Sequence, residues 1–364
     1  MSGKSKLDKA REIINQVDKE MAELFVKRMQ AAEMVAEHKA ERGLAILDTA
    51  REDEIVREGA KRIDSPVLRE YYINFLKSNM AISRAYQARL MQGLSVAYTG
   101  TEGAFAHIAC EHLYPDAKKI SYPDFKSAYK AVEDGECDIC VLPVENSYNG
   151  EVGQVTDLMF SGSLYVNGMY ELAVTQDLLG IEGADITKIK KVISHPQALG
   201  QCREYIREKG FEIEQYSNTA LAAEYVARLG DPTVAAIASK EAAGKFGLAV
   251  LDHDINAQRN NTTRFAIFSR VSNATNAKDA NMHSILLFTV RNEAGSLAKA
   301  LDVIGSFGFN MRTLRSRPMR ELLWEYYFYV ETEGNIQSEK GQSLLEALGE
   351  FCDKLKFAGA YTKI

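Results

Sequence analysis

The most constraining feature of the sequence is a long helical pattern, beginning near residue 7, whose apolar stripe contains a positive charge. The stripe consists of positions at spacings of four and three: Val17, Met21, Leu24, Arg28, Ala31 and Val35. That spacing is typical of an amphipathic helix with one buried face. A guanidinium that is buried without a partner costs several kcal/mol. The pattern therefore predicts a helix that packs against other helices and meets an anionic group at Arg28.

The first 92 residues show almost no strand character and divide into three helices of unequal length. Gly43 ends the first, a second is expected over 48–62, and the Asp-Ser-Pro sequence at 64–66 caps a third that continues to residue 90. Three such helices enclose little core alone. Pairing with a second copy of the chain is therefore expected.

Further polar side chains fall on shared faces of these helices. Lys39 follows Arg28 by 11 residues, which returns it to within about 20° of the same face. Arg11 lies about 25 Å before Arg28 along the axis and joins the set only if a second chain runs antiparallel alongside. The other members are Asp48, Arg51 and Glu52 on the second helix, and Ser83 and Gln87 on the third. Surface ion pairs explain Arg51 and Glu52 taken alone, whereas the full set favours an anion-binding cavity shared by two chains.

Three segments, "REIINQVDKEMAELFVKRMQAAEMVAEHK", "DTARED" and "SRAYQ", resemble the all-helical class of chorismate mutase over a full domain length. The resemblance implies that Arg28, Lys39, Arg51 and Arg11 of the partner subunit surround the two carboxylates and the ether bridge of chorismate. It assigns the substrate's hydroxyl and flanking groups to Asp48, Glu52 and Ser83, and it places Gln87 with Lys39 at the ether oxygen. Arg28, Lys39, Glu52 and Gln87 are the expected catalytic residues. The rearrangement of chorismate to prephenate is intramolecular and needs no proton transfer, so cations and amide donors suffice.

Residues 93–271 alternate strand-like and helical stretches, which predicts an α/β unit whose site lies where strand ends meet loops. One of the expected strands spans 170–179. Polar clusters follow strand ends at 98–107, 143–158, 194–202 and 260–265. Each cluster alone reads equally well as a turn, a helix cap or a plain loop.

In this order the clusters resemble prephenate dehydratase over residues 94–270, and "VENS" at 144–147 with "TRF" at 263–265 carry the specific signal. The resemblance implies two α/β lobes with the site in the cleft between them. Thr263 would offer its hydroxyl to the departing 4-hydroxyl of prephenate, and Arg264 would fix a carboxylate or the cleft wall. The remaining expected cleft residues are Thr101, Gly103, His107, Glu145, Asn146, Ser147, Ser194, His195 and Gln197. Aromatisation drives the loss of water and carbon dioxide, so no metal or organic cofactor is expected.

Residues 282–364 follow a polar linker and show the order βαββα, with a last helix over 338–354 and a final strand, which predicts an α+β ferredoxin-like sandwich. The segments "GSLAKAL" and "RSRP" resemble the phenylalanine-binding motifs of the ACT regulatory domain. The implied effector residues are Gly295, Ser296, Leu297, Ala298, Asn310, Arg315, Ser316, Arg317 and Pro318. Arg315 departs from that family, which usually has an acidic residue there. A plain dimerisation domain is the alternative.

Composition limits the partners and the compartment. The 364 residues exceed the size of one growing core, so two or three domains are expected. A net charge of -6 without a dense Lys/Arg run argues against nucleic acid or an anionic membrane surface. No window approaches roughly 18 apolar residues. The five scattered cysteines, including Cys137 and Cys140, are expected to be unpaired thiols in the cytoplasm rather than metal ligands.

The leading hypothesis is a multidomain bifunctional enzyme, a homodimer or homotetramer, that converts chorismate to phenylpyruvate and is inhibited by phenylalanine. Two alternatives stay open: a dehydratase whose helical domain is only a dimerisation scaffold, and a non-catalytic amino-acid sensor with a binding-protein-like cleft. The sequence also leaves open whether the enzyme accepts arogenate, the amino-acid analogue of prephenate, in addition to prephenate.

Overall fold

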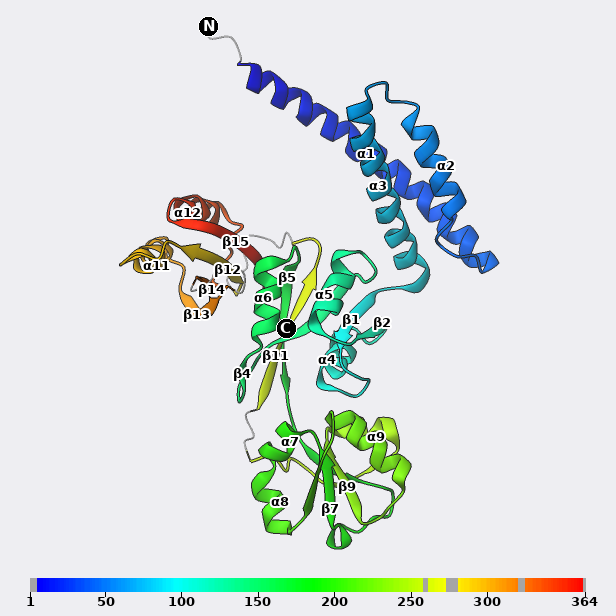
Figure 1. Ribbon diagram of the computed structural model, residues 1–364, viewed down its shortest axis with the longest axis vertical. Coiled ribbons are helices and arrows are strands. Elements are labelled where there is room, and N and C mark those ends of the chain that lie inside the picture. Colours follow the sequence, from blue (N-terminus) through cyan, green and yellow to red (C-terminus); the bar gives the residue numbers. More distant parts are fainter. Residues whose placement is uncertain (1–4, 258–260, 273–280, 320–324, 363–364) are drawn as a thin grey trace. The chain divides into compact units, whose positions relative to one another are not determined.

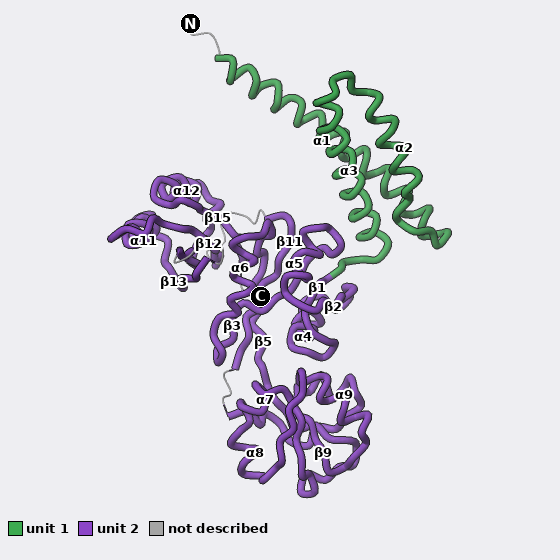
Figure 2. The backbone as a smooth tube through the Cα atoms, viewed as in Figure 1, with its two compact units in different colours: residues 1–95 green, residues 96–364 purple. Residues whose placement is uncertain are grey.

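The computed structural model describes residues 5–257, 261–272, 281–319 and 325–362. It forms two compact units, residues 1–95 and residues 96–364 (Figure 2). Because residues 96–364 form a single unit, their division into domains at 271–282 stays a prediction, and most of the expected linker lies outside the described residues.

The first unit contains the three expected helices: α1 (Lys6–Arg42), α2 (Thr49–Ala60) and α3 (Pro66–Gln92). Local chemistry explains their ends. Ser5 caps α1, which stops where Gly43 takes a left-handed conformation with φ 63°. The side chains of Asp48 and Ser65 accept backbone N–H bonds at the starts of α2 and α3. Both α1 and α2 pack on α3.

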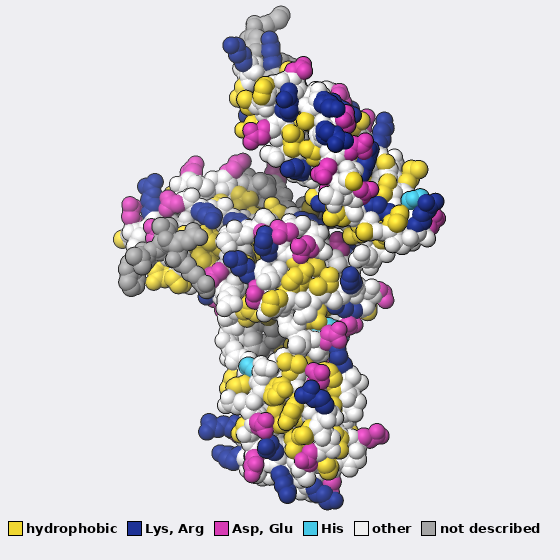
Figure 3. Space-filling model, turned by 45° about the vertical axis from the view of Figure 1, so that its right-hand side comes forward, with side chains coloured by type: hydrophobic (Ala, Val, Ile, Leu, Met, Phe, Trp, Pro, Cys, Tyr) yellow, Lys and Arg dark blue, Asp and Glu magenta, His cyan; other side chains and the backbone are white. Residues whose placement is uncertain are grey.

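The long helix α1 buries very little of itself within one chain. Among its 37 residues, Ala32 and Ala36 are the buried ones. Apolar side chains on it that remain exposed include Ile13, Ile14, Leu24, Val26 and Met34. Figure 3 shows hydrophobic side chains at the surface of this unit. A chain with this much uncovered apolar surface is expected to pair with another surface.

The second unit begins with two α/β lobes (Figure 1). The first lobe has a sheet in the order β2-β1-β3-β11-β5, with β4 paired to β3. Its strands are β1 (Ser95–Thr99), β2 (Lys118–Tyr122), β3 (Ile139–Asn146), β4 (Gly150–Glu151), β5 (Tyr165–Ala173) and β11 (Thr262–Ser269). Its helices are α4 (Phe105–Leu113), α5 (Phe125–Glu133) and α6 (Gly153–Ser161).

The second lobe is inserted between β5 and β11, and its sheet runs in the order β10-β6-β9-β7-β8. Its strands are β6 (Asp177–Gly180), β7 (Lys191–Ser194), β8 (Glu212–Gln215), β9 (Val234–Ala238) and β10 (Ala249–Asp252). Its helices are a 3₁₀ turn (Ile186–Lys188), α7 (Pro196–Gln201), α8 (Arg203–Lys209), α9 (Thr219–Leu229) and α10 (Lys240–Phe246). The prediction of a single strand over 170–179 was wrong, because β5 ends at Ala173 and the chain crosses to the other sheet before β6 begins at Asp177.

The C-terminal region, residues 281–362, has the element order βαββαβ. Its antiparallel sheet runs β13-β14-β12-β15. The elements are β12 (His283–Val290), α11 (Ser296–Ser306), β13 (Met311–Pro318), β14 (Tyr326–Glu333), α12 (Glu339–Gly349) and β15 (Cys352–Tyr361). The last helix is shorter than expected, since residues 352–354 already belong to β15.

The C-terminal region shares a hydrophobic core with the first lobe. Leu142 and Met159 of the lobe belong to the same buried cluster as Ile285 and Tyr327 of the C-terminal region. Strand β15 lies against β5, and a Cβ at Gly359 would come within 2.1 Å of the Val166 carbonyl oxygen. Only glycine permits so close a backbone approach.

Candidate functional site

A cavity of about 420 Å³ lies among the three helices of the first unit. The structure brings seven of the eight residues expected in the first site to its wall: Arg28, Lys39, Asp48, Arg51, Glu52, Ser83 and Gln87. Arg11, the eighth, is exposed on the amino-terminal part of α1 and does not line this cavity. Arg84 also lines the wall and was missed, although it belongs to the "SRAYQ" segment.

Arg28 places a positive charge in this cavity. Within the described residues its guanidinium bonds neutral groups and no carboxylate. Its Nη1 donates to the Asn79 carbonyl oxygen at 3.1 Å and to the Ser83 hydroxyl. Burial lowers the pKa of the Arg28 guanidinium, but an arginine keeps its charge at neutral pH. An anionic ligand would supply the missing countercharge.

The other polar groups of this cavity are partly engaged. Arg84 bonds Glu52, and the Lys39 ammonium bonds the Ile46 carbonyl oxygen. Arg51 pairs with Glu54 at an exposed position. The Gln87 Oε1 atom is buried and has no hydrogen-bond partner in the described part of the chain. Such an atom usually marks a place where a ligand or water binds.

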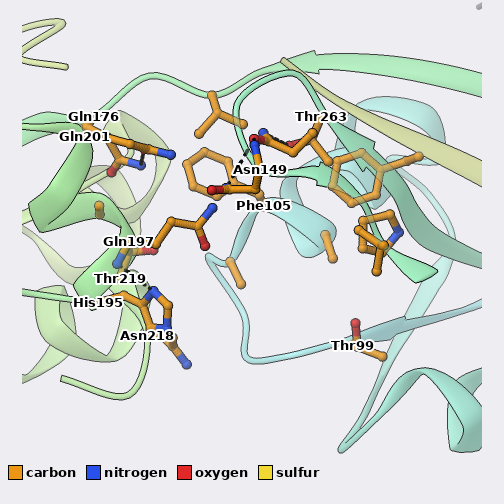
Figure 4. Close-up of a pocket in the computed structure, with 18 of the residues that line it drawn as sticks. Thr99, Phe105, Asn149, Gln176, His195, Gln197, Gln201, Asn218, Thr219 and Thr263 are labelled. Carbon is orange, nitrogen blue, oxygen red and sulfur yellow. Dashed lines mark hydrogen bonds between the residues drawn. The ribbon is translucent and has the colours of Figure 1, made fainter. Parts of the chain in front are cut away.

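A second cavity, of about 430 Å³, lies between the two α/β lobes (Figure 4). Of the residues expected there, it brings together Asn146, His195, Gln197 and Thr263. Its polar wall also contains residues that were missed: Thr99, Asn149, Gln176, Gln201, Ser217, Asn218 and Thr219. Phe105, Phe125 and Phe265 form the aromatic part of its apolar surface.

Thr263 is held in a defined hydrogen-bond orientation. The Asn146 Nδ2 group donates to Thr263 Oγ1 at 3.0 Å and to Asn261 Oδ1 at 2.8 Å. The Asn146 Oδ1 atom accepts the backbone N–H groups of Tyr148 and Asn149 at 3.0 and 2.9 Å, which fixes the orientation of the amide. Because Thr263 accepts from Asn146, its own hydroxyl proton remains available for donation into the cavity.

Four helices begin at the wall of the second cavity. Residues at the starts of α4, α6, α7 and α9 line it, namely Ala104, Val152, His195 and Asn218. The first turns of α4 and α6 have no side-chain cap, so their backbone N–H groups are not satisfied in that way. Helix N-termini favour negative charge. These termini can bind anionic groups in a cavity whose described lining contains no lysine or arginine.

The second lobe supplies an amide pair. Gln176 and Gln201 lie side by side at the wall, with Gln176 Nε2 donating to Gln201 Oε1 at 3.4 Å (Figure 4). The Gln176 Oε1 atom is buried without a partner in the described structure. The His195 Nδ1 atom accepts the Gln197 backbone N–H at 3.3 Å, so a neutral His195 carries its proton on Nε2.

Several expected cleft residues stand beside the cavity rather than in its wall. Thr101 accepts a bond from Asn218 across the lobes at 3.3 Å, and Gly103, at φ 84°, donates to His107 Nδ1. Burial lowers the pKa of His107, whose ring packs on Tyr98. Ser147 Oγ accepts the Thr262 N–H, and Ser194 Oγ bonds the Ile237 carbonyl oxygen. Through these contacts the expected residues hold the segments that line the second cavity.

Glu145 and Arg264 lie outside the described lining of the cavity. Each follows or precedes a cavity residue on its strand, and successive strand residues point to opposite faces. Arg264 bonds Glu331 of the C-terminal region, and Glu145 bonds Arg315 of that region. Their side chains therefore face the C-terminal region instead of a substrate.

The residues expected to bind an effector do not gather in one place within a single chain. A cavity of about 590 Å³ in the C-terminal region is lined by Leu297 together with Asn292, Glu293 and Phe328. Gly295, at φ 84°, opens α11 next to it. The described lining contains none of Asn310, Arg315, Ser316, Arg317 and Pro318. Asn310 bonds Glu333, and Arg317 bonds Asp157 of the first lobe at 3.1 Å.

Two searches of the described residues bear on other classes of function. They contain no cluster of three or more His, Cys, Asp or Glu side chains arranged to hold a metal ion. None of the described helices combines the length and the apolar character needed to cross a membrane.

Comparison with known proteins gives two families along the chain. Residues 10–88 match the family described as chorismate mutase type II, and residues 96–273 match prephenate dehydratase. The bifunctional chorismate mutase/prephenate dehydratase of Neisseria gonorrhoeae is 31% identical over 354 residues, which cover 96% of this chain and 95% of that protein.

Two solved structures resemble the second unit. Prephenate dehydratase from Arthrobacter aurescens in complex with L-Phe is 26% identical with a TM-score of 0.67, covering 74% of this chain and 90% of that one. A structure described as GqqA, a novel type of quorum quenching acylases, is 30% identical with a TM-score of 0.68, covering 74% of this chain and 98% of that one. The order and extent of these matches agree with the two cavities, one in each unit, and the chain belongs to the bifunctional chorismate mutase/prephenate dehydratase family.

Proposed function

We propose that the helical unit rearranges chorismate to prephenate and that the cleft of the second unit converts prephenate to phenylpyruvate, the two reactions lying in sequence on the route to phenylalanine. Family membership supports the pair of activities. The observation that carries the assignment of the second reaction is the orientation of Thr263, whose hydroxyl accepts from Asn146 and can donate into the cavity.

The helical cavity suits a rearrangement that moves charge without moving protons. Arg28 and Lys39 of α1 line this cavity, with Arg28 bonded to α3, and Gln87 of α3 also lines the wall. In the transition state the breaking C–O bond leaves negative charge on the ether oxygen. Lys39 and Gln87 would stabilise that charge, while Arg28 binds a carboxylate and holds the compact conformer.

The cleft suits a 1,4-elimination. The hydroxyl of Thr263 gives its proton to the 4-hydroxyl of prephenate as the C–O bond breaks, so this group leaves as water, and Thr263 regains a proton from solvent. The electrons come from the bond between the ring and the carboxylate that departs as carbon dioxide, and the ring becomes aromatic. The helix N-termini of α4 and α6 would bind the other carboxylate, and Phe105 would pack on the ring.

The exposed apolar side of α1 supports a homodimer or homotetramer in which the partner subunit contributes to each helical cavity. Ile13 and Leu24 are 66% and 62% exposed in the single chain. Arg11 lies on the same helix, about 25 Å from Arg28. An antiparallel pair of α1 helices would bring Arg11 of the partner subunit toward the cavity and cover the apolar stripe.

Phenylalanine is the proposed effector, bound by an ACT-type C-terminal region. The βαββαβ order, the φ 84° turn at Gly295 and the cavity beside Leu297 support it. Because the Arg315 and Arg317 side chains face the first lobe, an effector site that includes both motifs needs a second copy of the region. Sub-millimolar phenylalanine should lower the dehydratase rate, and rates that stay flat up to saturating phenylalanine would contradict feedback.

The experiment that tests both activities is a neutral-pH time course from chorismate that resolves prephenate from phenylpyruvate. The parent chain should form phenylpyruvate, and Thr263→Ala should stop at prephenate. A parent that stops at prephenate refutes the dehydratase assignment. A parent that leaves chorismate unchanged makes the helical unit a scaffold.

The resemblance to GqqA makes an acylase a second reaction to test. An acylase that used Thr263 as a nucleophile would need a base to take its proton. The polar contact that the structure gives Thr263 Oγ1 is a donor, Asn146 Nδ2, at 3.0 Å. This geometry favours the dehydratase. The acylase would be favoured if the parent chain hydrolysed an N-acyl substrate and Thr263→Ala did not.

A further inference from the structure

A row of four alternating charges joins the first lobe to the C-terminal region. Glu331 of β14 accepts two bonds from Arg264 of β11, at 3.0 and 3.2 Å. Arg264 also bonds Glu145 of β3 at 3.4 Å, and Glu145 in turn accepts from Arg315 of β13. The first and last members come from the C-terminal region, and the two in the middle come from the first lobe.

The row lies directly behind the residues that carry the proposed dehydration. In the pairing of β11 with β3, Thr263 is opposite Asn146 and Arg264 is opposite Glu145. Since successive strand residues point to opposite faces, the Thr263–Asn146 pair faces the cavity and the Arg264–Glu145 pair faces the C-terminal region. Each of these charged side chains therefore shares its strand backbone with a neighbouring cavity residue.

The Glu331–Arg264 end of the row is buried, whereas the side chains of Glu145 and Arg315 at the other end are 28% and 23% exposed. The Glu331 side chain is 4% exposed and that of Arg264 is 18% exposed. The Tyr361 hydroxyl bonds both of them. Burial acts to raise the pKa of Glu331, but the bonds to Arg264 outweigh it and hold this pKa below its usual value. A buried ion pair is weak evidence for stability, and in some proteins such pairs fix one geometry instead.

Arg315 extends the row in a way that depends on its charge. Its guanidinium lies 5.7 Å from the centre of the Tyr329 ring and bonds Glu145. An acidic residue, which the resemblance to the ACT family leads one to expect at this position, would face the Glu145 carboxylate with like charge. The arginine therefore matches the acidic residue on β3 of this chain.

We propose that Glu331 and Arg315 are positioning residues for the dehydratase reaction: acting through Arg264 and Glu145, they hold the strand pair that presents Thr263 and Asn146 to the substrate. The proposal rests on the dehydratase function proposed above. It makes the C-terminal region a structural part of the cleft even when no effector is bound.

The test compares Arg315→Gln, Arg315→Lys and Glu331→Gln with the control Arg312→Gln in the full chain. Arg312 lies on the same strand, is 55% exposed and pairs with Glu333 within the C-terminal region. Arg315→Gln and Glu331→Gln should each lower kcat for prephenate about tenfold with KM nearly unchanged. Arg315→Lys should retain most of the rate, and Arg312→Gln should equal the parent. Mutase turnover should be unchanged in all four.

Amide hydrogen exchange on the same proteins guards against a variant that merely unfolds. In Arg315→Gln, exchange should rise in residues 262–269 and 139–146, while the second lobe exchanges as in the parent. Equal kcat in Arg315→Gln and Arg312→Gln overturns the proposal. So does a rise in KM alone, failure of Arg315→Lys to restore the rate, or faster exchange throughout the second unit.

The exchange experiment also separates this proposal from the proposed function. If the parent lacks dehydratase turnover, the proposed function fails. Amide hydrogen exchange alone then decides whether Arg315 and Glu331 hold strands β3 and β11 in place. Selective loosening of β3 and β11 in Arg315→Gln would preserve the positioning role, and unchanged exchange in these strands would overturn it.

Discussion

The cavity of the helical unit and the cleft of the second unit have similar volumes, about 420 and 430 Å³. They differ in the groups that could bind an anion. The helical cavity is lined by four cationic side chains, Arg28, Lys39, Arg51 and Arg84, and two acidic ones, Asp48 and Glu52. The described lining of the cleft contains one carboxylate, Glu151, one imidazole, His195, and no lysine or arginine. Its other members carry hydroxyls, amides, aromatic rings or small apolar side chains, and helix N-termini reach it.

The difference follows from the two proposed reactions. A rearrangement without proton transfer gains most from fixed charge placed where charge develops, and side-chain cations provide it. An elimination needs a proton donor at the leaving oxygen, and a cation at the departing carboxylate would hold it back. Backbone N–H groups bind the other carboxylate without that penalty. The following predictions test this contrast, beginning with the largest expected effect.

Arg28→Ala should have the largest effect. It removes the guanidinium that binds the proposed substrate carboxylate, so mutase kcat/KM should fall about a thousandfold. Turnover of added prephenate should stay at the parent level. Lys27→Ala is the matched control, because Lys27 is an exposed cation on the same helix. Equal rates in the two variants, measured by loss of chorismate, would remove Arg28 from the site.

Thr263→Val should lower dehydratase kcat about a hundredfold, since it removes the proton donor but keeps a side chain of similar size. Mutase kcat should not change. Thr262→Val provides the control one residue earlier on β11, where the side chain alternates away from the cavity. Phenylpyruvate formation from prephenate measures both. A Thr263→Val enzyme with normal turnover would mean that another group protonates the leaving hydroxyl.

The contrast between the units also explains how far the sequence predicted them. In the helical unit the spacing of polar residues indicated which side chains share one face of each helix, and the resemblance to chorismate mutase supplied the combined set. Arg84 was a charged lining residue that was missed, and Arg11 does not line the cavity of the single chain. The cleft is assembled from loops far apart in the chain. Gln176 and Gln201 are 25 residues apart in the sequence and form a hydrogen bond at the cavity wall. Local periodicity predicts neither this contact nor the convergence of helix N-termini around the cavity.

Glu145 and Arg264 show what a stricter use of periodicity could have found. Each is adjacent to an expected cavity residue in a strand, so the alternation of faces alone places it on the opposite side. The partners on that side, Glu331 and Arg315, come from 67 and 170 residues away in the sequence. Such long-range contacts have no local signal, and only the structure shows them.

Asn261→Ala should have a moderate effect on the cleft. It removes the acceptor, Asn261 Oδ1, that holds the Asn146 amide at 2.8 Å. With Asn146 less restrained, dehydratase kcat should fall about tenfold while mutase kcat is unchanged. Asn149→Ala is a useful comparison, because the Asn149 side chain donates to the other end of the same amide at 3.2 Å. An Asn261→Ala rate equal to that of the parent would show that the backbone contacts alone orient Asn146.

The smallest expected effect concerns stability and pH. Lys356 of β15 donates to the Met159 and Gly162 carbonyl oxygens of the first lobe, and burial lowers its pKa from 10.5 to about 8. Between these values the unfolded chain binds the proton and the folded chain releases it. The free energy of unfolding of the second unit should therefore rise as the pH increases from 8 to 10, by less than about 3 kcal/mol.

Equilibrium unfolding in urea at pH 7, 8, 9 and 10 would measure this rise, and Lys356→Met should reduce it. Lys299→Met is the control, since Lys299 is an exposed lysine on α11 of the same C-terminal region. Parent and Lys356→Met profiles of equal slope would assign the pH dependence to other groups.

The most direct test of the central claim, that two separate sites act in sequence, is a mixing experiment that starts from chorismate. Arg28→Ala alone and Thr263→Val alone should each form almost no phenylpyruvate. An equimolar mixture should form it after a lag, because prephenate released by Thr263→Val is consumed by the intact cleft of Arg28→Ala. A mixture that accumulates prephenate without phenylpyruvate, although Arg28→Ala turns over added prephenate, would contradict the account.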